Sequence, residues 1–223
     1  MKRTKIADRN LPDYTKGEEI FNMVSHIVGG GIGVIVLVMC IIIGVIDRDI
    51  YAVISGAVFG LTMIVLYTMS SIYHGLRPET TKKVFQVLDH CSVYFFIAGS
   101  YTPFCLCTLR GYKPILGWSV FAIVWGLAVL GITLNAIDLK SFRVVSMILD
   151  LGMGWCILFT AKVMYELLGA VGFILLLGGG IAYTIGAILY GAGRKYRYIH
   201  SVFHLFVLLG SILHALCVLI YIM

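Results

Sequence analysis

The sequence predicts an all-α protein, a bundle of seven transmembrane helices with its N-terminus in the cytoplasm and its C-terminus outside. Two observations exclude a water-soluble domain. Hydrophobic residues make up 60% of the 223 residues and charged residues only 13%, whereas about a quarter of a soluble domain is charged. The apolar residues also form long blocks, including 20–46, 51–75 and 120–137. About 20 such residues cross the hydrocarbon core of a bilayer.

The first three expected helices lie between clusters of charged residues and proline. A polar, basic tail, residues 1–19, precedes a helix over 20–46. Its apolar block is too long for the hydrophobic region of a signal peptide, so we expect an uncleaved helix. The second helix is expected over 51–75 and the third over 84–109.

Four further helices are expected over 115–137, 142–165, 168–191 and 199–222. Glu166 is almost the only polar residue between the fifth and sixth helices. Merging these two would give a helix of about 50 residues, far too long for a bilayer. The short connections leave no room for a second domain, so we expect residues 20–223 to form one membrane domain.

The distribution of Lys and Arg predicts the orientation. With the N-terminus inside, the cytoplasmic segments hold thirteen of the 17 basic residues and the outer ends hold four. Cytoplasmic loops carry the excess of Lys and Arg in membrane proteins. The net charge of +6 therefore indicates orientation, and we expect no nucleic-acid partner. The chain is expected to be a multi-pass protein of the cell membrane.

Glycines and cysteines inside the spans are expected to serve packing. The glycine-rich stretches 29–33 and 178–180 are not followed by Lys-Ser/Thr, as a phosphate-binding loop would be. Small residues within spans let helices approach closely. The six cysteines form no CxxC pair, and we expect most of them to fill apolar space.

Ionisable side chains within spans are costly and tend to mark function. In this sequence they are His26, His74, Asp89, His90, Asp150, His200, His204 and His214, with Glu18 and Glu19 at the threshold of the first helix. The topology places four of them near the cytoplasmic surface, on three different helices: His74, Asp89, His200 and His204.

The spacing of these histidines suggests a metal site. His200 and His204 are four residues apart and therefore share one helical face. With His74 from a neighbouring helix they form a three-histidine set, which is common in catalytic zinc sites. The pattern is not the HExxH motif, because no Glu follows the first His.

Structural roles are alternatives for each of these residues. His200, taken alone, could be a histidine that lies near the lipid headgroups. For His26 and His214 we expect hydrogen bonds to a neighbouring helix. Three roles are open for Asp150: a metal ligand, a partner for a cation on the inner side, or a helix-packing contact.

Three motifs, taken together, resemble those of the hemolysin III family. Residues 70–74 (SSIYH) are similar to its S-x3-H motif, residues 88–92 (LDHCS) to its third-helix motif, and residues 200–204 (HSVFH) to its seventh-helix H-x3-H motif. That family belongs with the progestin and adipoQ receptors, which include the adiponectin receptors. The resemblance covers residues 18–222, and the short tail favours the bacterial branch.

The resemblance implies specific roles for the residues in these motifs. His74, His200 and His204 would bind a zinc ion. Asp89 would hold the zinc-bound water without contacting the metal, and Ser70 would lie beside the ligands. The wider superfamily includes alkaline ceramidases, which hydrolyse a lipid amide with zinc. Asp150 departs from the pattern, since an uncharged residue is expected there.

Three functions follow as hypotheses. The first is a zinc-dependent hydrolase of a ceramide-like amide or an ester lipid, serving membrane lipid homeostasis. Zinc lowers the pKa of bound water from about 15.7 to about 7. Asp89 would orient this water and accept its proton, and Ser70 would donate to the developing oxyanion. The alternatives are a membrane-perturbing cytolysin and a receptor-like signalling protein with structural zinc.

Overall fold

The computed structural model describes residues 4–192 and 196–223, and this part of the chain is helical with no β-strand. The all-α prediction is therefore confirmed. The long elements are α1 (Lys16–Ile46), α2 (Ile50–Gly75), α3 (Glu79–Pro103), α5 (Pro114–Asp138), α6 (Arg143–Trp155), α7 (Ala161–Ala192) and α8 (Ile199–Tyr221). The short ones are the 3-10 turns η1 (Ile6–Asp8) and η3 (Cys156–Thr160), the π-helical η2 (Phe104–Leu109) and α4 (Arg110–Tyr112).

Six helical segments of the described chain are long and apolar enough to cross a membrane. Seven were expected, and the difference arises between residues 143 and 192. This stretch forms one helical run of 50 residues, but its backbone is not helical throughout. At Gly169 the φ angle is 68° and ψ is 177°. Glycine reaches positive φ without a steric penalty, so the chain can bend sharply there. The expected helix boundary lies within three residues of this bend.

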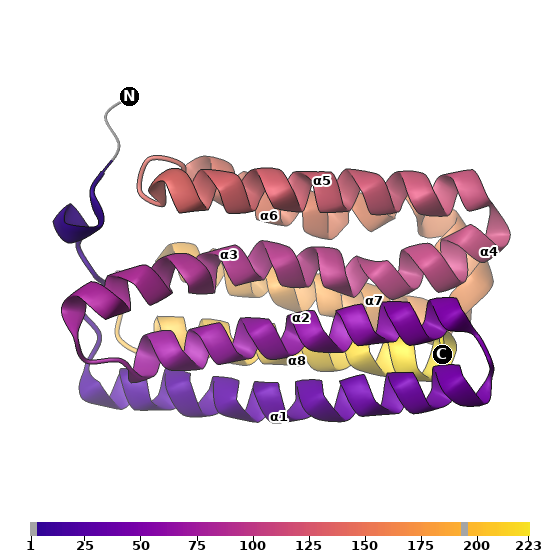
Figure 1. Ribbon diagram of the computed structural model, residues 1–223, viewed down its shortest axis with the longest axis horizontal. Coiled ribbons are helices and arrows are strands. Elements are labelled where there is room, and N and C mark those ends of the chain that lie inside the picture. The colour runs from indigo at the N-terminus through magenta and orange to yellow at the C-terminus, as the bar shows by residue number, and fades with distance from the viewer. Residues whose placement is uncertain (1–3, 193–195) are drawn as a thin grey trace.

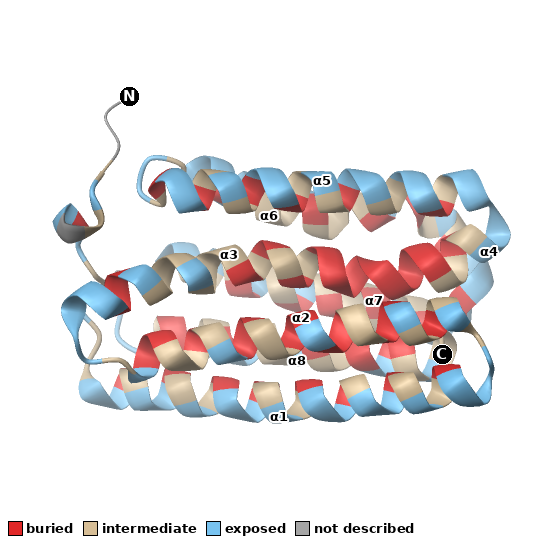
Figure 2. Ribbon diagram, in the orientation of Figure 1, coloured by how far each residue is buried: buried red, intermediate tan, exposed pale blue. Residues whose placement is uncertain are grey.

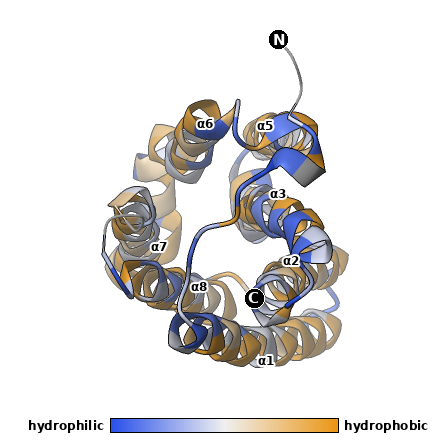
Figure 3. Ribbon diagram, turned by 90° about the vertical axis from the view of Figure 1, so that its left-hand side faces the viewer, coloured by the Kyte–Doolittle hydropathy of each residue, from blue (hydrophilic) through white to orange (hydrophobic). Residues whose placement is uncertain are grey.

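The helices form a ring when viewed from the end at which the N-terminus lies (Figure 3). Each long helix contacts its neighbours in chain order, and α8 closes the ring by packing against α1. Figure 1 shows that the helices run side by side along the long axis, with the N-terminus and C-terminus at opposite ends. Residues on α1, α2 and α8 therefore meet on one side of the ring.

Glycines allow α1 and α2 to pack closely, as expected for residues 29–33. A Cβ atom at Gly29 would lie 2.6 Å from the Tyr67 ring, and one at Gly33 would lie 3.1 Å from Ile64. Gly60 on α2 is as tightly packed against the backbone of α1, because its Cβ would lie 2.6 Å from the Cα atom of Leu37. Gly31 has no atom within 4 Å of that position and is exposed, so the packing role does not extend to every glycine in the stretch.

The bundle is apolar on the outside and buries most of its polar groups at one end. Large exposed side chains such as Ile35 and Val45 on α1 and Ile123 on α5 face outward. Figure 2 shows that buried positions are concentrated along α3, which lies between α2 and α5. This exterior is suited to a lipid environment, in which lipid replaces water around the helices.

The basic tail crosses the end of the ring in Figure 3, from α5 to the start of α1 beside α8. The Thr4 backbone N–H donates to the Asp138 carboxylate at 2.8 Å, and η1 packs against α3.

α1 begins at Lys16, four residues before the expected boundary, because Thr15 and Glu18 form a capping box. Of the thirteen cations assigned to the cytoplasmic side, four lie outside the described residues: Lys2, Arg3, Arg194 and Lys195.

Candidate metal centre

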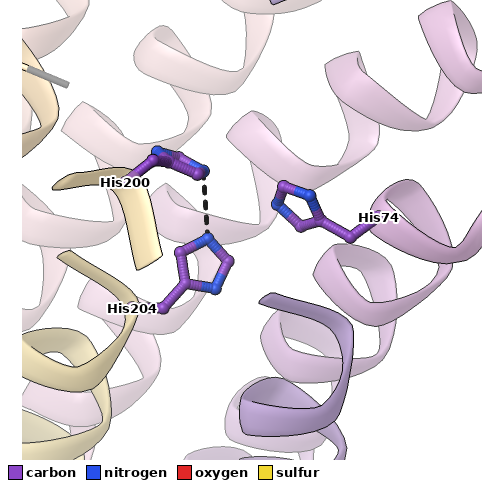
Figure 4. Close-up of side chains that lie close together, drawn as sticks. All are labelled: His74, His200 and His204. Carbon is purple, nitrogen blue, oxygen red and sulfur yellow. Dashed lines mark hydrogen bonds between the residues drawn. The ribbon is translucent and has the colours of Figure 1, made fainter. Parts of the chain in front are cut away.

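Three histidines come together where α2 faces α8. Figure 4 shows His74 opposite His200 and His204, with the three rings directed toward one another. One ring nitrogen from each lies within 4.8 Å of the others, and the Nε2 atoms of His200 and His204 are 3.0 Å apart. His74, His200 and His204 are 3%, 8% and 1% exposed, respectively. The sequence prediction that these three residues lie together is confirmed in its geometry.

Glu18 on α1 fixes the start of α8, and with it the position of His200. The Tyr198 backbone N–H donates to Glu18 Oε1 at 2.6 Å. Tyr198 itself has a φ of 61°, which is uncommon for a residue other than glycine. The helix begins directly after this turn, so His200 and His204 occupy its first two turns on one face.

Glu19 on α1 orients the ring of His74. The His74 Nδ1 and Glu19 Oε2 atoms are 2.6 Å apart, and Lys82 Nζ lies 2.6 Å from the other carboxylate oxygen. An ionised carboxylate has no proton to donate, so His74 Nδ1 carries the proton and donates it to Glu19. In the neutral ring the free lone pair is then on Nε2. This Nε2 is buried and has no hydrogen-bond partner.

Two further rings from the N-terminal part of the chain enclose the histidines. Tyr14 in the tail stacks on His200, with ring centroids 4.9 Å apart and an interplanar angle of 17°. His26 on α1 lies against His204, with centroids 3.8 Å apart. The three histidines are therefore covered from the tail side by Tyr14 and from the α1 side by His26.

The arrangement fits a metal ion. A tetrahedral zinc ion with nitrogen ligands at about 2.0–2.1 Å places those nitrogens about 3.3 Å apart. The observed separations, from 3.0 Å to within 4.8 Å, span that value. Metal-binding histidines commonly donate their other N–H to a carboxylate, as His74 does to Glu19. The unpartnered His74 Nε2 is also the atom that such a metal would use.

The other two predicted site residues, Asp89 and Ser70, lie on α3 and α2, which pack against each other. Ser70 is buried on α2, one turn before His74, and Asp89 is a partly buried residue of α3. The carboxyl group of Asp89 lies 3.9 Å from His90 Nδ1. The roles assigned to Asp89 and Ser70 stay predictions, since their neighbours are compatible with either positioning or chemistry.

The remaining histidines have separate surroundings. His214 lies 3.1 Å from the Leu176 carbonyl on α7, as expected for a helix-packing histidine. The same expectation is wrong for His26, because both of its ring nitrogens are buried without a hydrogen-bond partner. His90 contacts the Tyr190 hydroxyl at 3.1 Å. Asp150 is not part of the triad, and its buried Oδ1 has no hydrogen-bond partner.

Sequence reasoning gave no role to Glu19, Tyr14 or Asn22. Glu19 stood out only as a charge at the start of the first helix. Asn22 is fully buried one turn later, with neither side-chain atom paired. Its position four residues before His26 is the signal that both face the bundle.

Comparison with known proteins identifies the family. The sequence model of a family described as Haemolysin-III related matches residues 14–215. The chain belongs to the haemolysin-III-related family. Hemolysin-3 of Bacillus cereus is 40% identical over 206 residues, covering 92% of each chain. The Hemolysin-3 homolog of Bacillus subtilis is 36% identical over 208 residues, covering 93% of this chain and 96% of the relative.

A human member of the wider group is more distantly similar. The human Monocyte to macrophage differentiation factor is 25% identical over 171 residues, which cover 74% of this chain and 69% of that protein. The resemblance to the haemolysin-III-related family stated from three sequence motifs is thus confirmed, and all three motifs lie inside the matched region.

We predict that Glu19→Gln weakens binding of a divalent metal about 10- to 100-fold, because a carboxylate partner holds a metal-binding histidine in place. The affinity is to be measured by metal titration of the purified chain. The control is Glu79→Gln, which removes an exposed carboxylate paired to Lys83 on α3. Equal affinity in the two variants would show that Glu19 does not support the site.

Proposed function

We propose that this haemolysin-III-related protein binds a zinc ion through His74, His200 and His204 and hydrolyses an amide or ester bond in a membrane lipid. Such an activity would serve membrane lipid homeostasis. The observation that carries the proposal is the buried triad, whose His74 ring is oriented by Glu19 and keeps Nε2 unpartnered. A structural histidine cluster would need neither feature.

Zinc is the metal that suits this donor set. Three neutral imidazoles bind zinc in catalytic sites and leave a fourth position for water or substrate. When bound, the ion would activate water near neutral pH and polarise a carbonyl group.

The surrounding residues have separate tasks in this mechanism. Asp89, on the helix that packs against α2, would accept a proton from water. Ser70, which is buried one turn before His74, would donate to the developing oxyanion. Glu19 holds His74, and the stacked Tyr14 ring shields His200 from water.

A groove between α1 and α2 supports a lipid as substrate. It has a volume of about 580 Å³ and is lined by residues of both helices, among them Ile27, Gly30, Val34, Thr68 and His26. Ile27 and Val34 are 56% and 49% exposed on the outer surface. His26 also contacts the ring of His204. A lipid chain in this groove would therefore lie beside the triad without leaving the membrane.

We further propose seven spans in the cell membrane, with the N-terminus in the cytoplasm. The bend at Gly169 supports this count, since it divides the 50-residue run into two segments, each long enough to cross a bilayer. The excess of Lys and Arg on the segments assigned inside supports the orientation.

Metal analysis tests the zinc site. We expect about one zinc per chain in the purified protein, and a large loss in His74→Ala, because three ligands are the minimum for a stable site. His214→Ala serves as the control, since His214 lies ten residues along α8 from His204, about 15 Å away. Zinc that stays in His74→Ala would refute the assignment.

Turnover of lipids separates the hydrolase from the other functions. Release of fatty acid from ceramide or phospholipid should stop in His204→Ala, provided that the variant elutes as wild type in gel filtration. Zinc retained in the wild type with no turnover of any lipid would favour a receptor-like role. Leakage of loaded vesicles without lipid hydrolysis would favour the cytolysin.

Filling the groove should block the lipid but spare the metal. We expect Gly30→Phe to reduce lipid turnover at least about tenfold, because its side chain would occupy the space next to Tyr67. Gly31→Phe is a matched control, since the neighbouring glycine faces outward with no atom near. Zinc content should equal that of the wild type in both. Equal turnover in the two variants would exclude this groove as the route.

The orientation is tested with fusions to the C-terminus. Alkaline phosphatase is active only outside the cytoplasm, and green fluorescent protein exported through the general secretory route stays dark. We expect an active phosphatase fusion and a dark fluorescent fusion, because an odd number of spans places the ends on opposite sides. The reverse pattern would contradict the proposed topology.

A further inference from the structure

The tail over residues 4–15, here called the strap, is held at both ends across the bundle. Its first end is joined to α5 through the Thr4 N–H and the Asp138 carboxylate. Its second end carries Tyr14, stacked on His200, and Thr15, which caps α1. Figure 3 shows this segment passing over the end of the ring of helices. A residue in the middle of the strap therefore has a defined place in the fold.

Arg9 in the middle of the strap is buried with unpaired donors. The residue is 4% exposed, and its Nε and Nη1 atoms are buried with no hydrogen-bond partner. A guanidinium does not lose its proton in proteins, so burial cannot be relieved by neutralisation. An unpaired buried charge is strongly unfavourable. The position thus calls for a partner that accepts hydrogen bonds and carries negative charge.

The other buried cations of the described chain contrast with Arg9. Lys82 and Lys83 are 8% and 7% exposed. Each has a carboxylate at 2.6 Å, from Glu19 and Glu79 respectively.

The carboxylates that the two ends of the strap contact already accept hydrogen bonds from other groups. Asp138 accepts from Thr4, Lys140 and Ser141, and Glu18 accepts from Thr15 and Tyr198. The described part of the chain places no ion-pair partner at Arg9, although it supplies one to each comparable cation.

We propose that Arg9 binds the oxyanion of an external ligand, a phosphate or carboxylate group, at the tail end of the bundle. The planar guanidinium matches these anions in geometry and in charge. The five residue steps from Arg9 to Tyr14 span at most about 18 Å, and Tyr14 stacks on His200. The anion would therefore lie within the length of a lipid molecule of the histidine triad. This site goes beyond the proposed hydrolysis and does not require it.

The ligand chemistry has two sources, free anions and lipid headgroups. The full chain is held in micelles of dodecyl maltoside, a detergent with no anionic group, and its unfolding temperature is measured with and without inorganic phosphate. In a second arm the micelles also contain phosphatidylglycerol, and a third arm adds oleate. A ligand that binds only the folded state raises the unfolding temperature. A rise with phosphate assigns a free anion, and a rise only with phosphatidylglycerol or oleate assigns a lipid.

The variants test whether Arg9 is responsible. We expect Arg9→Gln to bind the stabilising anion at least about tenfold more weakly, since hydrogen bonds to charged groups are lost. Lys5→Gln is the matched control, because Lys5 is an exposed cation of the same strap. If Arg9→Gln does not fold, Arg9→Lys supplies the answer, because it keeps the charge but not the planar donors and should bind with intermediate affinity.

Three results would overturn the assignment: no anion stabilises the wild type, Lys5→Gln loses as much affinity as Arg9→Gln, or Arg9→Lys binds as tightly as the wild type. The same measurements on His74→Ala keep this test separate from the hydrolase proposal. Anion binding is expected to persist in that variant, even if zinc and turnover are absent.

Discussion

Two adjacent carboxylates at the start of α1, Glu18 and Glu19, hold together the end of the bundle that carries the three histidines. Neighbouring residues on a helix point about 100° apart, so Glu18 and Glu19 face different partners. Glu18 binds the backbone that starts α8, and Glu19 binds His74 on α2 and Lys82 on α3. Four helices therefore meet through two consecutive side chains. The distance between His74 and the α8 histidines depends on this connection, since these residues come from helices far apart in the sequence.

The position of these polar contacts follows from the lipid environment. Inside a bilayer every polar group must find its partner within the protein. Most of the chain meets this requirement with apolar side chains and with local hydrogen bonds from Ser and Thr to the preceding turn. The unpartnered buried atoms of Asn22, His26 and His74 are among the exceptions, on α1 and α2.

The sequence was sufficient for the all-helical class and for the grouping of the three histidines, for a physical reason. Helical spacing and the span boundaries together determine the depth and the face of His74, His200 and His204. It was not sufficient for contacts that depend on which helices are neighbours in the ring. Glu19 beside His74, and His26 against His204, arise from the packing of α1 between α2 and α8. A break near Gly169 was expected, because Glu166 interrupts the apolar run and a helix of about 50 residues would be too long for a bilayer, but the positive φ of Gly169 was not.

The strap has a consequence for the order in which the protein is assembled. Thr4 is bonded to a residue 134 positions later, and Glu18 to one 180 positions later. A ribosome adds about 5–20 residues per second, so the interval between synthesis of Glu18 and Tyr198 is roughly 10–40 seconds. The start of α1 thus waits for α8 before it can settle. The three histidines come together only after α8 is made, and a chain arrested before α8 would have neither a complete triad nor a strap held at both ends.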